Sequence, residues 1–189
     1  MPHIHPVTPA EATGAVSDLY DEMTAVRGSV PNLFQLLGYS PKMLGPAIAL
    51  ANFAGSPDSR VPARHKQLAY LIASYMNNCH YCLERHAVAG AKAGLTVAQI
   101  EAILDEEDIN LLESPVFDAR EKLIIQYSQE LTAYTATTPE TIEAMKKTFD
   151  DEEFLELTFV IATANMFNRL AEGLAVQLEP EYIRKTKED

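Results

Sequence analysis

Residues 77–103 read NNCHYCLERHAVAGAKAGLTVAQIEAI, and they contain two helix patterns in succession. Asparagine is a poor residue inside a helix but a good one at its ends, so we expect a helix to begin at Asn78. Gly94 closes this helix, and Thr96 caps a second one over 97–104. The stretch therefore predicts a helix, a short break and another helix.

The rest of the chain carries the same signals, namely hydroxyl or acidic caps, proline at first helical positions and apolar residues at helical spacing. No convincing alternating strand pattern interrupts them. The fold class predicted from this pattern is all-α, a helical bundle with short connections. The helices expected outside the opening stretch cover residues 8–27, 40–53, 62–76, 116–134, 138–148 and 150–174, with a short apolar segment over 33–37.

A weak internal helical repeat is also visible. Ala63-Arg64-His65-Lys66 opens a long helix, and Ala119-Arg120-Glu121-Lys122 opens another one 56 residues later. In each half a shorter helix, a break and a further helix follow, although chance similarity between amphipathic helices gives the same impression. Only the first half carries cysteines, and the matching stretch of the second reads AYTATTPETI. We expect a single domain over 1–189, with an N-terminal helical extension over 1–60 and a core over 61–178.

Composition excludes several classes of partner. The chain has 189 residues and a formal net charge of −12. Nucleic acids and anionic membranes both need a basic face, so we expect neither as a partner. Neither a leader peptide nor an apolar run long enough to span a membrane is visible, which predicts a cytoplasmic protein. A chain of this size folds without a disulfide or a metal, so its two cysteines are available for chemistry.

Both cysteines and a histidine share one face of the helix expected from Asn78. Helical residues advance about 100° each, so Cys79, Cys82 and His86 are spread over roughly 60° of that face. The amide N–H groups at a helix start favour a thiolate, and His86 lies one turn beyond Cys82. A nucleophilic thiol, a second thiol and a base are the parts that thiol redox chemistry requires.

Two other interpretations of the cysteine pair stay open at this point. Cysteine is often a small buried apolar residue, although Cys79 and Cys82 are the only two in the chain. A structural zinc site needs four ligands, and His80 and His86 would have to complete it from one short helix. Because such a helix cannot wrap a tetrahedral ion, we predict no metal site.

Some other side chains have two interpretations. Asn165, Asn168 and Arg169 are polar residues on an otherwise apolar helix. They are either satisfied buried or interface residues or the lining of a substrate pocket. Tyr70 is interpreted as a core residue.

The segment from Gln67 to Ala102 resembles the core of the alkylhydroperoxidase D (AhpD)-like group within the carboxymuconolactone decarboxylase superfamily. Near the N-terminus, EATGAVSDLYDEM and GSVPNLFQLLGYSPKML resemble the longer, peroxidase-related members of that group. Near the C-terminus, NMFNRLAEGLAVQLEPEY resembles their closing helix. The resemblance covers most of the chain.

This resemblance implies an all-helical homo-oligomer, a trimer or a hexamer, that reduces hydroperoxides without a cofactor and is reduced in turn by a thiol protein. Carried over to this sequence, Cys82 attacks the peroxide and becomes a sulfenic acid. Cys79 then condenses with it to a disulfide. His86 is the base of the proton relay.

One position departs from the family motif, which has a glutamate twelve residues before the first cysteine. This chain has Gln67 there. Glutamine can orient a group by hydrogen bonding, but it cannot hold a negative charge or take a proton. We therefore expect Gln67 to support His86 without replacing the carboxylate. His65, His80 and Glu84 are the nearest substitutes, and none has the expected spacing.

The departure keeps other functions open. The chain could be a thiol-disulfide oxidoreductase or redox sensor that acts on a protein. It could also decarboxylate a muconolactone-like acid, with Arg169 as the cationic group, although that branch of the superfamily does not use a CxxC pair. A noncatalytic oligomeric scaffold would have unreactive thiols.

Overall fold

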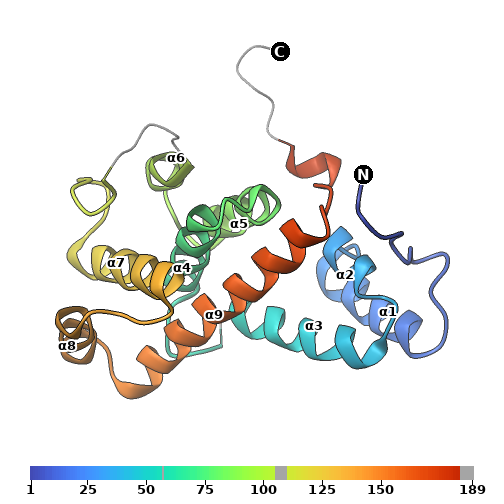
Figure 1. The fold of residues 1–189 in the computed structure, drawn as a ribbon, viewed down its shortest axis with the longest axis horizontal. Coiled ribbons are helices and arrows are strands. Elements are labelled where there is room, and N and C mark those ends of the chain that lie inside the picture. The colour runs from blue at the N-terminus through green and yellow to red at the C-terminus, as the bar shows by residue number, and fades with distance from the viewer. Residues whose placement is uncertain (57, 105–109, 184–189) are drawn as a thin grey trace, which may run out of the picture. The chain divides into compact units, whose positions relative to one another are not determined.

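The computed structural model describes residues 1–56, 58–104 and 110–183, and this part of the chain is helical and contains no strand. The predicted all-α fold class is confirmed. The helices, which can be followed in Figure 1, are α1 (Ala15–Arg27), α2 (Asn32–Leu36), α3 (Pro41–Gly55), α4 (Ala63–Met76), α5 (His80–Lys92), α6 (Val97–Leu104), α7 (Ala119–Tyr134), α8 (Pro139–Thr148), α9 (Asp151–Gly173) and the 3-10 turn η1 (Pro180–Tyr182).

The chain divides into two compact units. One comprises Met1–Phe53 and the segment from Leu170 onward, and the other comprises Ala54–Arg169. In the first unit, the buried Tyr20 donates its hydroxyl to the carbonyl of Val7 at 3.0 Å, and the Asn32 amide donates to the Glu179 carboxylate at 2.7 Å. These bonds tie both ends of the unit to its middle.

The helix expected to start at Thr8 begins later. Thr8 donates its amide N–H at 2.9 Å and its hydroxyl at 2.7 Å to Glu11, as the sequence pattern suggests, and the hydroxyl bond lowers the pKa of Glu11 to about 2. These bonds close only a single turn. The chain then passes through Gly14 at φ 55°, and α1 begins at Ala15.

Helix α4 lies at the centre of the second unit. Its residues 66–74 are all buried, so this helix has no solvent-facing side over more than two turns. Three of the nine are polar, namely Lys66, Gln67 and Ser74. The Lys66 ammonium donates to the Ser59 hydroxyl at 2.7 Å, and burial lowers its pKa. The other two polar side chains contribute to the site described below.

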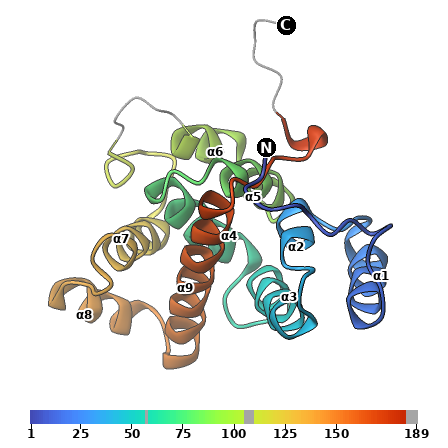
Figure 2. The ribbon, with the colours of Figure 1, turned by 45° about the vertical axis from the view of Figure 1, so that its right-hand side comes forward.

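The two halves suggested by the sequence pattern correspond to two three-helix series, α4–α5–α6 and α7–α8–α9. The first helices of the two series pack against each other, and α4 and α7 lie side by side in both views (Figures 1 and 2). Each of them begins with Ala-Arg, at Ala63-Arg64 and Ala119-Arg120.

The arginines of the repeat make equivalent contacts. Thr96 and Gln99 exchange hydrogen bonds at the start of α6, and Arg64 lies 3.4 Å from the Gln99 side-chain oxygen. Asp150 and Glu153 exchange the same bonds at the start of α9, and Arg120 donates to Glu153 at 2.9 Å. In each series the arginine therefore holds the cap of the third helix.

Candidate functional site

The site begins where α4 ends. Asn78 has a φ of 51°, its N–H donates to the Tyr75 carbonyl at 3.0 Å, and the Cys79 N–H donates to the Ser74 carbonyl at 3.0 Å. These two bonds define a Schellman motif. Asn78 occupies the left-handed position that asparagine tolerates better than most residues.

This turn corrects the predicted start of the next helix. Asn78 closes α4 instead of opening α5, so the N-cap is Cys79 and the first helical residue is His80. The first intrahelical bond of α5 runs from the Leu83 N–H to the Cys79 carbonyl at 2.9 Å. Cys82 is therefore the third residue of the helix, in its first turn.

Both cysteines are thiols in the structure, and both are buried. The side chain of Cys79 is 0% exposed, and that of Cys82 is 3% exposed. Cys82 lies in the first turn of α5, near the N-terminal amide groups of that helix. The structure thus places the two thiols one helical turn apart at the same helix end.

His86 lies one turn further along α5 and is held from α4. Its Nδ1 is 2.8 Å from the side-chain oxygen of Gln67. An amide oxygen only accepts hydrogen bonds, so Nδ1 carries the proton and Nε2 is the nitrogen of the neutral ring that can take one. Gln67 is buried and fixes the tautomer that a general base needs.

Tyr70 is the residue that sequence reasoning assigned only to the core. Its ring stacks on the imidazole of His86, with centroids 3.6 Å apart and planes 12° from parallel. Burial raises the pKa of Tyr70 well above its ordinary value, and the charges of Cys82 and Cys79 add to the effect, so the phenol stays neutral. Gln67 and Tyr70 are three residues apart on α4 and share a face, and this spacing was the signal that could have identified the pair.

Other candidate residues lie apart from this cluster. His80 is exposed and lies 4.0 Å from the buried Glu84, its neighbour one turn along α5. Burial and then the charges of Arg64 and Arg120 lower the pKa of His65. Arg169 is exposed and donates to the Asn165 side chain on its own helix at 2.8 Å.

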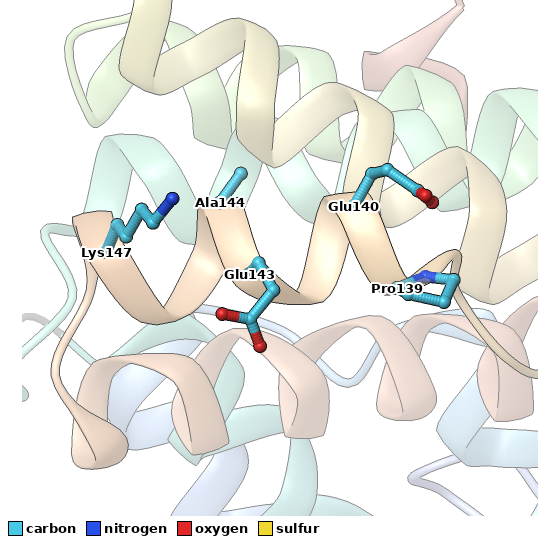
Figure 3. A pocket seen from close by; sticks show the side chains of 5 residues that line it. All are labelled: Pro139, Glu140, Glu143, Ala144 and Lys147. Carbon is cyan, nitrogen blue, oxygen red and sulfur yellow. The ribbon is translucent and has the colours of Figure 1, made fainter.

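Two further searches of the described residues bear on the site. No group of three or more His, Cys, Asp or Glu side chains among them could hold a metal ion. None of the helices described is both long and apolar enough to span a membrane. Figure 3 shows a surface pocket that lies away from the thiols, because its lining comes from one helix, α8: Pro139, Glu140, Glu143, Ala144 and Lys147.

The fold resembles that of known proteins. Residues 43–111, which include both cysteines and His86, match the carboxymuconolactone decarboxylase family. The chain is 16% identical to an uncharacterized peroxidase-related protein with the alkylhydroperoxidase AhpD core from Ralstonia eutropha JMP134, over 96% of this chain and 94% of that one, with a TM-score of 0.82.

Two more solved structures share the fold. ATU0492 from Agrobacterium tumefaciens, a protein of unknown function with a suggested role as the antioxidant defence protein AhpD, is 26% identical over 75% of this chain and 93% of that one, with a TM-score of 0.65. The debrominase Bmp8, in complex with 2,3,4-tribromopyrrole, is 15% identical over 95% and 93% of the two chains, with a TM-score of 0.79.

The helical architecture is therefore shared with the peroxidase-related protein that has the AhpD core. The match to the carboxymuconolactone decarboxylase family covers residues 43–111, and the solved structures show that the chain shares the fold of AhpD-like, peroxidase-related proteins. One of the proteins that share the fold, the debrominase Bmp8, is an enzyme.

Proposed function

We propose that this chain reduces hydroperoxides with Cys82 as the attacking thiol, Cys79 as the resolving thiol and His86 as the base. The observation that carries the proposal is the geometry of His86, which is bonded to Gln67 through Nδ1 and stacked on Tyr70, one turn after Cys82. The helix that holds both thiols therefore also carries a ring nitrogen that can accept a proton.

The chemistry balances in two steps. The Cys82 thiolate attacks the hydroperoxide, the O–O bond breaks, and sulfenic acid and alcohol form, with His86 passing the thiol proton to the leaving oxygen. The Cys79 thiol then attacks the Cys82 sulfur, and a disulfide and water form. A dithiol reductant restores both thiols by exchange. No step requires a metal or an organic cofactor.

Burial of the thiols favours a small oxidant over a protein. Thiol-disulfide exchange requires the attacking sulfur to reach the sulfur of its partner, and the sulfurs here lie in residues that are 0% and 3% exposed. A protein disulfide would need the helix start to open, whereas a hydroperoxide is a small molecule. No specific contact favours the decarboxylase alternative, since Arg169 bonds to its own helix.

The testing experiment counts free thiols before and after one equivalent of cumene hydroperoxide. We expect both thiols of the wild type to disappear and to return with dithiothreitol, and we expect the remaining Cys79 thiol of Cys82→Ser to persist. In Cys79→Ser, Cys82 should accumulate as a sulfenic acid that dimedone traps. Persistence of both thiols in the wild type would overturn the proposal. A parallel arm uses 2,3,4-tribromopyrrole, because Bmp8 is a debrominase, and a reaction with that probe alone would assign a different small oxidant.

The proposal includes a homo-oligomer, a trimer or hexamer, and a thiol protein as reductant. Side chains of α9 support the first part, since Leu155 is 68% exposed and Phe159 and Met166 are partly exposed at helical spacing. In a two-fold, antiparallel pairing of this helix, which a hexamer with D3 symmetry contains and a trimer does not, Leu155 would face Met166 and Glu152 would lie next to Arg169. Sedimentation of the wild type and of Leu155→Glu tests this, because a wild-type monomer would exclude the oligomer.

A further inference from the structure

Two asparagines link α9 to the end of α4. The Asn77 side-chain nitrogen is 2.9 Å from the Asn168 side-chain oxygen and 3.1 Å from that of Asn165. Asn168, which is 1% exposed, donates from its own nitrogen to the Ser74 hydroxyl at 3.0 Å. The polar residues that interrupt the apolar pattern of α9 therefore form a hydrogen-bonded network with α4.

The partners of Asn168 in these bonds, Ser74 and Asn77, belong to the turn before Cys79. Ser74 provides the carbonyl that accepts the Cys79 N–H, and Asn77 directly precedes the left-handed Asn78. Asn168 thus contacts both ends of the Schellman motif, at Ser74 through its nitrogen and at Asn77 through its oxygen. The turn fixes the backbone of Cys79, and side chains of α9 hold that turn by hydrogen bonds.

We propose that Asn168 is a positioning residue for the Cys79–Cys82 couple and that it sets the stability of the disulfide. A clamped turn keeps the two sulfurs at one helix end and so raises the effective concentration of one thiol at the other. This inference rests on the proposed function in that the two thiols form a redox couple. It does not depend on a peroxide being the oxidant.

The test measures disulfide formation against the dithiothreitol couple, without any peroxide. Oxidised dithiothreitol takes two electrons and two protons from Cys79 and Cys82, and one disulfide replaces the other. We expect Asn168→Ala to lower the equilibrium constant for disulfide formation about tenfold, which corresponds to a reduction potential about 30 mV more oxidising. The assay reports on the couple alone.

A second variant and a control separate positioning from general stability. Ser74→Ala removes the hydroxyl that accepts the Asn168 bond and donates to the Tyr70 carbonyl within α4, and it should shift the equilibrium in the same direction if Asn168→Ala fails to fold. The control is Tyr127→Phe, which removes a 2.7 Å bond to Thr158 earlier on α9. It should lower the unfolding midpoint and leave the dithiothreitol equilibrium unchanged.

The outcomes are distinct for the two proposals. An unchanged equilibrium in the folded Asn168→Ala variant, or in Ser74→Ala where the first does not fold, would overturn the positioning role. A shift in Tyr127→Phe as large as that in Asn168→Ala would also overturn it. A wild type that exchanges with dithiothreitol but ignores cumene hydroperoxide would instead refute the peroxidase proposal alone.

Discussion

The junctions that precede α5 and α8 have comparable capping positions but differ in length and chemistry, because residues 77–79 connect α4 to α5 and residues 135–138 connect α7 to α8. The second helix of each series has Cys79 or Thr138 as its N-cap, and Cys82 or Thr141 three residues later. In each half, the backbone N–H of the N-cap residue donates a hydrogen bond to a residue of the preceding helix. The Ser74 carbonyl accepts it at 3.0 Å in the first half, and the Glu130 carboxylate at 2.8 Å in the second.

The difference lies in what surrounds the side chains at these positions. In the second half Glu130 and Gln126 both bond to the Thr141 hydroxyl, so these polar groups are satisfied structurally. The position that corresponds to His86 is the fully buried Met145. Comparable capping positions therefore carry a stabilising polar cluster in one half and a thiol–imidazole cluster in the other. The side chains, not the fold, decide the chemistry.

The largest expected effect comes from exchanging the two junctions. Cys79→Ser with Cys82→Ser gives the first junction hydroxyls like those of the second, and peroxide consumption should fall to the uncatalysed rate because no thiolate remains. Thr138→Cys with Thr141→Cys in the same chain should not restore it, since Met145 offers no base there. Stopped-flow peroxide assays measure both, and activity in the exchanged protein would show that the His86 cluster is dispensable.

Replacing the Gln67 amide by a carboxylate should increase the difference in reactivity between the two halves. Gln67→Glu places a carboxylate on the Nδ1–H of His86, 2.8 Å away in the native arrangement. The negative charge favours the imidazolium and therefore the thiolate, so the rate with peroxide at pH 7 should rise roughly tenfold. Gln67→Leu, which has similar volume and no acceptor, is the control and should be slower than the wild type. Equal rates in all three would remove position 67 from the mechanism.

Backbone strain should break the first junction selectively. Asn78→Val puts a β-branched residue at φ 51° and should lower the free energy of unfolding by about 2 kcal/mol. It should also reduce thiol reactivity, because the turn places Cys79. Asn78→Gly, which adopts this conformation without strain, should keep both properties. Urea unfolding and thiol titration test the pair, and tolerance of valine would contradict the assigned turn.

In the second junction, a substitution can relieve backbone strain instead of adding it. Thr135 also has a positive φ, of 56°, although it is β-branched. Thr135→Gly should therefore raise the free energy of unfolding by about 0.5–1 kcal/mol. This value is the backbone strain that glycine relieves, reduced by the larger conformational entropy of glycine in the unfolded chain. Peroxide turnover should not change. A destabilised variant would indicate that the threonine hydroxyl matters more than its backbone conformation.

The smallest effect is a pH dependence confined to the second half. Burial opposes the ionisation of Glu130, but hydrogen bonds from the Thr138 N–H, Gln126 and Thr141 outweigh it and lower the pKa from 4.5. A lowered pKa means that the carboxylate contributes stability above pH 4.5 and loses it as the pH falls further. Glu130→Gln should flatten that acid limb in urea titrations. An unchanged limb would assign the acid sensitivity to other carboxylates.

Local signals were enough to predict much of the fold. Thr96 caps α6, whose predicted bounds of 97–104 agree with the structure. Thr138 caps α8, and the predicted start at 138 agrees as well. Asn78 was wrongly predicted to open α5, because an asparagine between two helices can close the first helix or cap the second. Only the bonds from Tyr75 and Ser74 decide between them.

The candidate site was predicted in part. Cys79, Cys82 and His86 were found because their spacing lies within one helix, and Gln67 followed from a family resemblance. Their assigned roles stay predictions. The stacking of Tyr70 on His86 and the bonds of Asn168 depend on which faces of α4 meet α5 and α9, and single-helix periodicity does not contain that information.

The paired arginine contacts at the caps of α6 and α9 also bear on the history of the chain. Arg64 and Arg120 occupy the same place in two consecutive three-helix series, and Arg64 additionally pairs with Glu121 of the other series. Duplication and fusion of one three-helix gene segment would leave this pattern. The Arg64–Glu121 pair would then descend from a contact between two separate chains. On that account the thiols belong to one copy, and the other copy has become its structural support.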